Sequence, residues 1–313
     1  MIQKTIFELK SLYRENMRVK GYQFGDGEKT VCILGATRGN EIQQVYICSQ
    51  LVKTLKSLEE QGKITEGKSI MVVPSINSYS MNTQKRFWPT DNTDINRMFP
   101  GYYLGETTQR IASGVFEQIN SYKYGIQFAS FYIPGIFTPH VRMLKTSYEN
   151  TDAAKDFGLP YIMLRTPKPY DTTTLNYNWQ LWGTQAFSLY THETDRIDEA
   201  SALQAHDAVL NFLDKNGIID YKRHRGYISA VFDNDDLVTV KPHSSGMFMA
   251  VKNVNEHVHT GDVLANIIHS FEGTVIEEIK SPVDGTVFFS HSSNLCNEHS
   301  LLFRILPDGK IKY

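Results

Sequence analysis

The most informative stretch of the chain is residues 86–101, which read RFWPTDNTDINRMFPG. The stretch follows a predicted strand at residues 69–76 and is rich in turn-forming residues, so we expect a loop after that strand. Arg86, Asn96 and Arg97 place two guanidinium groups and one amide in this loop. Such donors can bind a carboxylate and polarise a carbonyl group.

Two acidic residues of the same loop give an alternative interpretation of its arginines. Asp91 and Asp94 could neutralise them in ordinary surface ion pairs, which contribute little to stability and bind no ligand. Residue types alone do not distinguish carboxylate recognition from surface pairing. Both interpretations therefore stay open.

Strand-like runs alternate with helical patterns from the N-terminus to about residue 225. The predicted strands lie at residues 30–36, 69–76, 125–130, 161–166 and 186–191. Residues 41–61 and 198–215 have apolar side chains at helical spacing. This alternation predicts an α/β domain with a mixed, largely parallel sheet flanked by helices, in which binding sites lie at the carboxyl ends of the strands.

The helical period disappears after residue 225, where short strand-like pieces are separated by polar turns. Residues 244–267 and 281–305 each contain a strand, a turn and a strand, repeated at an offset of roughly 38 or 39 residues. Two such halves can interlock as a small all-β barrel-sandwich. We therefore predict two domains, an α/β domain at residues 1–225 and a β barrel-sandwich domain at residues 226–313.

Charge and composition exclude several classes of protein. The 313 residues include 32 basic and 34 acidic side chains, a formal net charge of −2, which excludes a general nucleic-acid binder. With 41% hydrophobic and 21% charged residues, the composition is that of a globular protein. No apolar segment resembles a secretory signal or a membrane span. We therefore expect a cytoplasmic protein without nucleic-acid or membrane partners, and a homo-oligomer stays open.

Three motifs together resemble one enzyme family. The pattern R-x-x-P-x-D-x-x-D-x-N-R-x-F-P-G lies between G-x-x-x-G-N-E at residues 35–41 and P-H-V-R at residues 139–142. This combination is similar to the succinylglutamate desuccinylase/aspartoacylase family, a branch of the zinc carboxypeptidase-like hydrolases. The resemblance implies a zinc-carboxypeptidase-like α/β domain followed by a small β domain. It also implies hydrolysis of an amide bond in a small N-acyl amino acid or peptide-like substrate.

The same resemblance implies roles for individual residues. Arg86 would polarise the substrate carbonyl, and Asn96 and Arg97 would hold the substrate carboxylate. Glu193 would act as the general base, and Glu41 would be the retained zinc ligand. The implied cofactor is zinc.

The sequence departs from the family at the zinc site itself. Arg38 replaces the first zinc histidine, and counting back from residues 139–142 places Ala129 where the family has its second one. All ten histidines lie at position 140 or later, so no shift of the motif recovers these two ligands. Because zinc sites need about three protein ligands, Glu41 alone does not hold the ion against water. We therefore expect zinc binding to be weak or absent.

Two arrangements could replace the zinc. Arg38 could place its cation in the metal's position, pair with Glu41 and offer donors to a ligand. Because arginine does not generate hydroxide from water, this arrangement would preserve binding and lose most hydrolysis. Alternatively, Glu41 could build a relocated metal site with His140, His192 or Glu193.

These observations lead to three hypotheses for the function. The first is an amide hydrolase with Glu193 as its base, although this carboxylate could instead pair with Arg196. The second is a catalytically inactive family descendant that binds a carboxylate ligand through Arg38, Arg86 and Arg97. The third is a purely structural role in assembly through the β domain.

Overall fold

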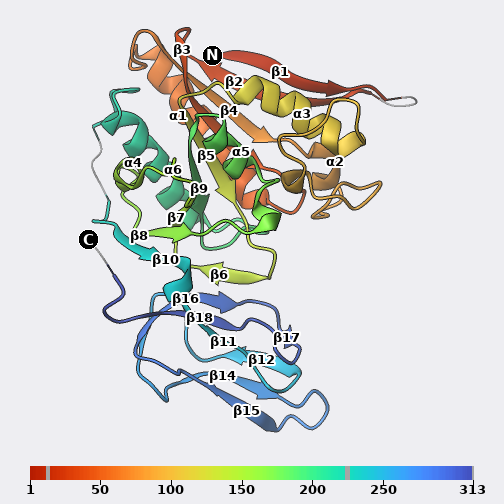
Figure 1. Ribbon diagram of the computed structural model, residues 1–313, viewed down its shortest axis with the longest axis vertical. Coiled ribbons are helices and arrows are strands. Elements are labelled where there is room, and N and C mark those ends of the chain that lie inside the picture. Colours follow the sequence, from red (N-terminus) through yellow and green to blue (C-terminus); the bar gives the residue numbers. More distant parts are fainter. Residues whose placement is uncertain (12–14, 223–225, 312–313) are drawn as a thin grey trace. The chain divides into compact units, whose positions relative to one another are not determined.

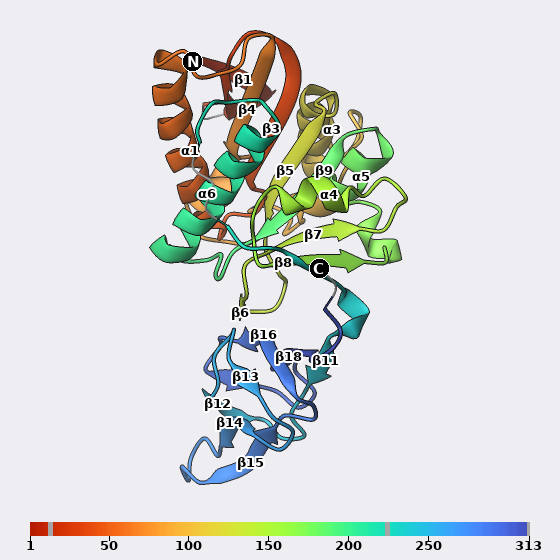
Figure 2. The same cartoon turned by 90° about the vertical axis from the view of Figure 1, so that its left-hand side faces the viewer.

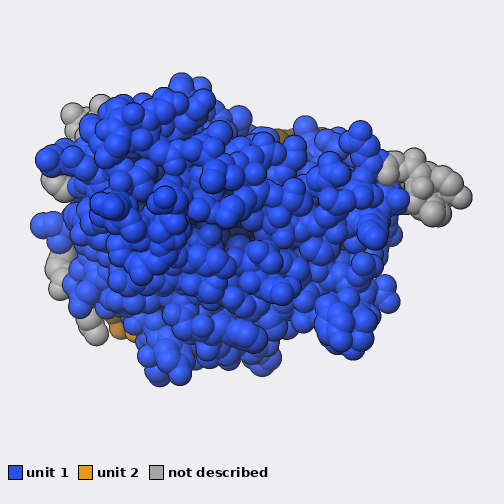
Figure 3. Space-filling view, turned by 90° about the horizontal axis from the view of Figure 1, so that it is seen from above, with its two compact units in different colours: residues 1–130, 139–229 blue, residues 131–138, 230–313 orange. Residues whose placement is uncertain are grey.

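The computed structural model describes residues 1–11, 15–222 and 226–311. The chain divides into two compact units (Figure 3). Unit 1 consists of Met1–Ser130 and Pro139–Ser229, and unit 2 consists of Phe131–Thr138 and Ala230–Tyr313. The domain boundary predicted after residue 225 falls on a residue outside the described ones and stays a prediction.

Unit 1 is built on a mixed sheet with the strand order β1-β2-β4-β3-β5-β9-β7-β8 (Figure 1). The strands are β1 (Ile2–Leu9), β2 (Met17–Phe24), β3 (Glu28–Ala36), β4 (Lys68–Ser75), β5 (Tyr124–Ala129), β7 (His140–Leu144), β8 (Tyr161–Arg165) and β9 (Gln185–Tyr190). The pairs β3–β4, β3–β5, β5–β9 and β7–β8 are parallel, whereas β1–β2, β2–β4 and β7–β9 are antiparallel. The predicted α/β sheet is confirmed, and β1, β2 and β7 are additions to it.

Helices lie on both faces of this sheet (Figure 2). The two predicted helices, α1 (Ile42–Glu60) and α6 (Glu199–Lys215), pack against each other on one face, and α3 (Thr107–Ile119) and α5 (Leu175–Leu181) lie on the other. Shorter helices are α2 (Ser78–Met81), η1 (Ile95–Arg97), α4 (Thr151–Lys155) and η2 (Pro169–Asp171). No helix within the described ranges is long and apolar enough to cross a membrane.

The central strands are apolar because helices cover both of their faces. Every residue of β5 is buried, and so are the last seven residues of β3, from Thr30 to Ala36. The α1 helix turns Ile47, Leu51, Leu55 and Leu58 toward this sheet at helical spacing. The carboxyl ends of β3 and β5 therefore form a rigid base for the loops that follow them.

Unit 2 is an all-β unit of two sheets. One sheet contains β11 (Val238–Val240), β18 (Phe303–Pro307), β16 (Gly285–His291), β13 (His257–Val258) and β6 (Gly135–Phe137). The other contains β15 (Val275–Lys280), β14 (Val263–Ile268), β12 (Gly246–Ala250) and β17 (Leu295–Cys296). The first elements after Ser229 are β10 (Ala230–Asp233) and η3 (Asn234–Asp236). Side chains of both sheets, such as Leu264 and Val287, share one apolar core. The unit agrees with the predicted all-β domain.

The packing of α5 on β5 can be tested at Gly125. A Cβ atom at this position would lie 2.6–2.9 Å from three ring atoms of Trp179, whose side chain is fully buried. Because a close-packed interior cannot yield freely, Gly125→Ala should lower the free energy of unfolding by about 1–3 kcal/mol in urea denaturation. In a Trp179→Phe background the same change should cost less, and equal costs in both backgrounds would contradict this packing.

Candidate functional site

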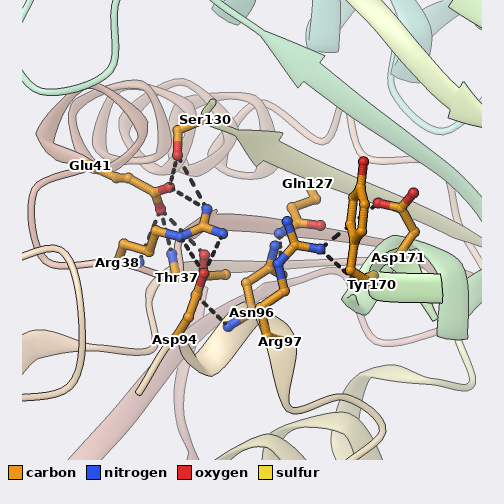
Figure 4. Close-up of polar contacts among 10 residues, drawn as sticks. All are labelled: Thr37, Arg38, Glu41, Asp94, Asn96, Arg97, Gln127, Ser130, Tyr170 and Asp171. Carbon is orange, nitrogen blue, oxygen red and sulfur yellow. Dashed lines mark hydrogen bonds and ion pairs between the residues drawn. The ribbon is translucent and has the colours of Figure 1, made fainter. Parts of the chain in front are cut away.

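A buried carboxylate closes the turn between β3 and α1. Glu41 is the N-cap residue of α1 and is 1% exposed. Its Oε2 accepts hydrogen bonds from the backbone N–H groups of Thr37 at 2.9 Å and Arg38 at 3.0 Å. Its Oε1 accepts one from Arg38 Nη1 at 3.0 Å and another from the Ser130 hydroxyl (Figure 4). Both carboxylate oxygens are therefore already in use.

The guanidinium group of Arg38 lies between two carboxylates. Its Nε and Nη2 donate to Asp94 Oδ2 at 3.1 and 2.8 Å, and its Nη1 donates to Glu41 and to Ser130 Oγ, the latter at 3.2 Å. Burial alone would lower the pKa of Arg38, but the charges and hydrogen bonds of Glu41 and Asp94 outweigh burial and raise it. Arg38 is therefore a fixed cation whose N–H groups are mostly occupied.

Apolar side chains anchor the loop of residues 86–101. Trp88 and Phe99 are 2% and 1% exposed and belong to the main core of unit 1. Among the described residues, Asp94 is the only loop residue that forms hydrogen bonds with the side chain of Arg38. Asp94 does pair with an arginine, as the surface-pairing alternative expects, but that arginine lies outside the loop.

The polar side chains of Asn96 and Arg97 lie beside the ion pair of Arg38 and Asp94 (Figure 4). Asn96 is 9% exposed, and its Oδ1 accepts a hydrogen bond from Gln127 Nε2 at 3.0 Å. Its Nδ2 has no acceptor among the described residues, so this amide can still donate to a ligand. The guanidinium of Arg97 is already partly occupied by protein acceptors. Its Nη1 donates to the Tyr170 carbonyl at 2.6 Å and lies 3.8 Å from Asp171 Oδ1.

Arg86 keeps its guanidinium group uncommitted. The side chain is half-buried, its guanidinium lies 5.8 Å from the ring centre of Phe87, and the described part of the chain gives it no ion pair. Burial, and then the positive charge of Arg38, lower the pKa of Arg86. A partly desolvated cation of this kind attracts an anionic ligand more strongly than a solvated one does.

Glu193 lies in the turn that follows β9. Its carboxylate accepts hydrogen bonds from Nε and Nη2 of Arg196, and its carbonyl accepts one from the Thr191 hydroxyl at 2.6 Å. Glu193 is 7% exposed, whereas the side chain of Arg196 is 72% exposed. The pairing with Arg196 is the alternative expected for this carboxylate, and its role as a general base stays a prediction.

The predicted substitute metal ligands do not assemble around Glu41. His192 Nδ1 lies 3.2 Å from Asp198 Oδ2, and the ring of His140 stacks on Tyr190 with the ring centres 4.8 Å apart. Within residues 1–11, 15–222 and 226–311, no three His, Cys, Asp or Glu side chains form a group that could hold a metal ion.

Sequence reasoning did not single out Ser130 and Gln127. Ser130 contacts both Glu41 and Arg38, whereas the predicted position of the missing second zinc histidine is Ala129, one residue earlier. The sequence could have pointed to such residues, because polar side chains at the carboxyl end of a predicted parallel strand often line a binding site. Ser130, the residue just after β5, therefore completes the hydrogen bonding of Glu41 at the turn between β3 and α1.

Comparison with known proteins identifies the family. Residues 27–215 match the family model described as the succinylglutamate desuccinylase/aspartoacylase catalytic domain. The chain belongs to this family. Membership in the desuccinylase/aspartoacylase family supports a hydrolase of the N-acyl amino acid deacylase type.

Solved structures of desuccinylase/aspartoacylase proteins share the fold. A succinylglutamate desuccinylase from a Silicibacter species is 19% identical, with a TM-score of 0.79 over 93% of this chain and 88% of that chain. The product-bound ectoine utilization protein EutE (DoeB) from Ruegeria pomeroyi is 18% identical, with a TM-score of 0.77 over 93% of this chain and 89% of that chain. At these identities the likeness shows the fold alone.

A curated relative matches a shorter segment of this family member. The N-alpha-acetyl-L-2,4-diaminobutyric acid deacetylase of Halomonas elongata is 28% identical over 88 residues. These residues make up 28% of this chain and 24% of the relative. The match therefore spans about a quarter of the relative's length.

The family typically uses zinc, and the residues at the turn do not fit that ion. Glu41 accepts five hydrogen bonds on its two oxygens, and a guanidinium nitrogen lies 3.0 Å from one of them. A second cation beside this one would be repelled and would find too few nitrogen, sulfur or oxygen ligands. The turn of this desuccinylase/aspartoacylase protein is therefore organised around arginine.

The Arg38 ion pair can be tested through stability. Arg38→Met leaves the Glu41 carboxylate buried without its counter-charge, which should lower the free energy of unfolding by about 3–5 kcal/mol in urea denaturation. Arg18→Met is the matched control, because it breaks the exposed Arg18–Glu8 pair and should leave the unfolding midpoint nearly unchanged. Similar midpoints for the two variants would contradict the structural role of Arg38.

Proposed function

We propose that this protein binds a small carboxylate of the N-acyl amino acid type without zinc-dependent hydrolysis. The observation that carries the proposal is the buried ion pair between Arg38 and Glu41, at 3.0 Å. Arginine remains protonated in proteins and cannot supply the metal-bound hydroxide that attacks an amide. Its charge can still favour an anionic ligand nearby.

The proposed ligand contacts come from the loop of residues 86–101. Arg86 and the Nδ2 of Asn96 have donors without a partner among the described residues, and Arg97 lies beside them with one nitrogen committed to Tyr170. A carboxylate between these donors would receive charge-assisted hydrogen bonds. Arg38 contributes mainly through its charge, because hydrogen bonds to protein atoms occupy most of its N–H groups.

The relatives support the class of ligand. The curated relative is a deacetylase of an N-acetylated amino acid, and a related structure of an ectoine utilization protein contains a product. A ligand of this class has a carboxylate and an amide carbonyl, the two groups that guanidinium and carboxamide donors bind. Arg86 would contact the carbonyl, while Asn96 and Arg97 would hold the carboxylate.

Hydrolysis is the second candidate function, and family membership over residues 27–215 favours it. This activity would require Glu193 to release Arg196 before its carboxylate could accept a proton. It would also require a group that activates water in place of the cation at Arg38. Binding without hydrolysis needs neither rearrangement, which is why we prefer it.

We also propose that the C-terminal all-β part is a barrel-sandwich, with the domain boundary near residue 225. The predicted half at residues 244–267 supplies β12 and β14 to one sheet and β13 to the other. The half at residues 281–305 supplies β17 to the first sheet and β16 and β18 to the second. Such an exchange of strands between sheets supports two interlocked halves.

Ligand binding can be tested by isothermal titration calorimetry with a panel of N-acetyl amino acids. Arg86→Gln should weaken binding about 10- to 100-fold, because it removes a charge-assisted hydrogen bond. Lys85→Gln is the matched control, since it removes one positive charge from an exposed neighbour in the same segment. Unchanged affinity in Arg86→Gln would exclude this loop as the binding site, and steady release of amine by the wild type would favour hydrolysis instead.

A further inference from the structure

The outward face of one sheet in unit 2 is largely apolar. Phe248 on β12 and Ile267 on β14 belong to the core that the two sheets share. Because successive side chains of a strand point to opposite faces, their neighbours Met247 and Ile268, which are paired with each other, point outward. Antiparallel sheets commonly carry polar residues on such a face. The apolar pair at this place is therefore not explained by the packing of unit 2 itself.

Met247 and Ile268 belong to a row that crosses the whole sheet. Met247 is also paired with Leu295 on β17, and Ile268 is also paired with Val275 on β15. Directly paired residues share a face, so each of the four strands contributes one apolar side chain to the row. The strand order is β15-β14-β12-β17, and the row therefore spans three strand spacings, roughly 14 Å.

Much of this row is exposed. Leu295 at one end is 63% exposed, and Val275 at the other end and Met249, which follows Met247 on the same face of β12, are exposed as well. Phe271 lies in the turn between β14 and β15, at the end of the hairpin where Ile268 and Val275 are paired, and is 95% exposed. Water contact at these side chains forgoes the hydrophobic gain that a covering surface would provide.

The exposed apolar area is large enough for a protein interface. We call the six residues the outer-face patch: Met247, Met249, Ile268, Phe271, Val275 and Leu295. At roughly 150–200 Å² for a large side chain in full contact with water, their exposure corresponds to roughly 600 Å², the upper end for the largest patch of a monomer. Two copies that cover this patch with each other would bury about 1,200 Å² in total, which is within the range of specific interfaces.

The rim of the outer-face patch carries charges of both signs. Glu278 on β15 is paired with Asn266, on the same face as Met249, and forms an ion pair with Lys280 at 3.1 Å. A two-fold contact brings identical surfaces together, so a rim of one sign would repel itself, whereas Glu278 and Lys280 can pair between copies. The carboxylates of Glu272 and Glu278 disfavour an anionic lipid surface. Size and charge together therefore fit a second copy of this chain.

We propose that the outer-face patch is the contact between two copies of this chain, which form a two-fold symmetric dimer through unit 2. The two apolar rows pack face to face, as stacked sheets do at a separation of about 10 Å. Phe271 of each copy covers apolar side chains of the other, and the charged residues form the polar rim of the contact. The inference is independent of the proposed carboxylate binding.

Sedimentation velocity of the full chain over a range of protein concentrations tests this contact. The wild type should sediment with twice the chain mass of 35.8 kDa. Leu295→Lys places two like charges in the apolar contact and should raise the dissociation constant of the dimer at least about 100-fold. Leu203→Lys is the matched control, because Leu203 on α6 is a similarly exposed leucine of unit 1, and it should leave the dimer intact.

Every outcome supports or overturns the proposed dimer. A wild type that remains monomeric at its highest soluble concentration would overturn it, and so would a dimer that Leu295→Lys leaves unchanged or that Leu203→Lys weakens equally. If Leu295→Lys does not fold, Phe271→Ser, in an exposed turn, should weaken the dimer at least about 10-fold, and an unchanged dimer in this variant would exclude the patch. Monomeric protein that sediments with phosphatidylcholine vesicles, and loses this binding in Phe271→Ser, would assign the patch to a lipid surface instead.

Discussion

The buried ion pair between Arg38 and Glu41 is the constraint on which the rest of the site depends. A carboxylate that is 1% exposed is stable only when its charge is balanced and its oxygens are hydrogen-bonded. The turn supplies two backbone N–H groups, and Arg38 supplies the charge. The same guanidinium binds Asp94, so one cation joins the strand–turn–helix segment to the loop of residues 86–101. Ser130 adds the end of β5 to this cluster.

This arrangement divides the arginines into two kinds. Arg38, Arg97 and Arg165 are held by protein acceptors and fix the backbone around the site. Arg86 and Arg142 have guanidinium groups without an ion pair among the residues described here. A positively charged surface with preplaced donors lowers the cost of binding an anion, whereas amide hydrolysis also needs an activated water. The proposal of binding without hydrolysis rests on this difference.

Much of the fold could be predicted because both faces of its central strands are covered. The apolar runs at residues 30–36 and 125–130 follow directly from that burial. The short strand β7 escaped prediction because His140 and Arg142 interrupt its apolar pattern, and α3 escaped because Thr, Ser and Gly lower its helix propensity. The loop residues were predicted from their motif, and the pairing of Arg38 with Glu41 was predicted from their closeness in sequence. The contacts of Arg38 with Asp94 and Ser130 were not predicted, because these residues are distant in sequence and meet only in the folded chain.

The most direct test of this account is the zinc content of the protein, purified without chelator and measured by elemental mass spectrometry after dialysis. Because Arg38 neutralises Glu41, the protein should retain far less than one zinc per chain and should still bind an N-acetyl amino acid. About one tightly held zinc per chain would contradict the structural role of this ion pair, because Glu41 would then have to exchange its guanidinium partner for a metal ion.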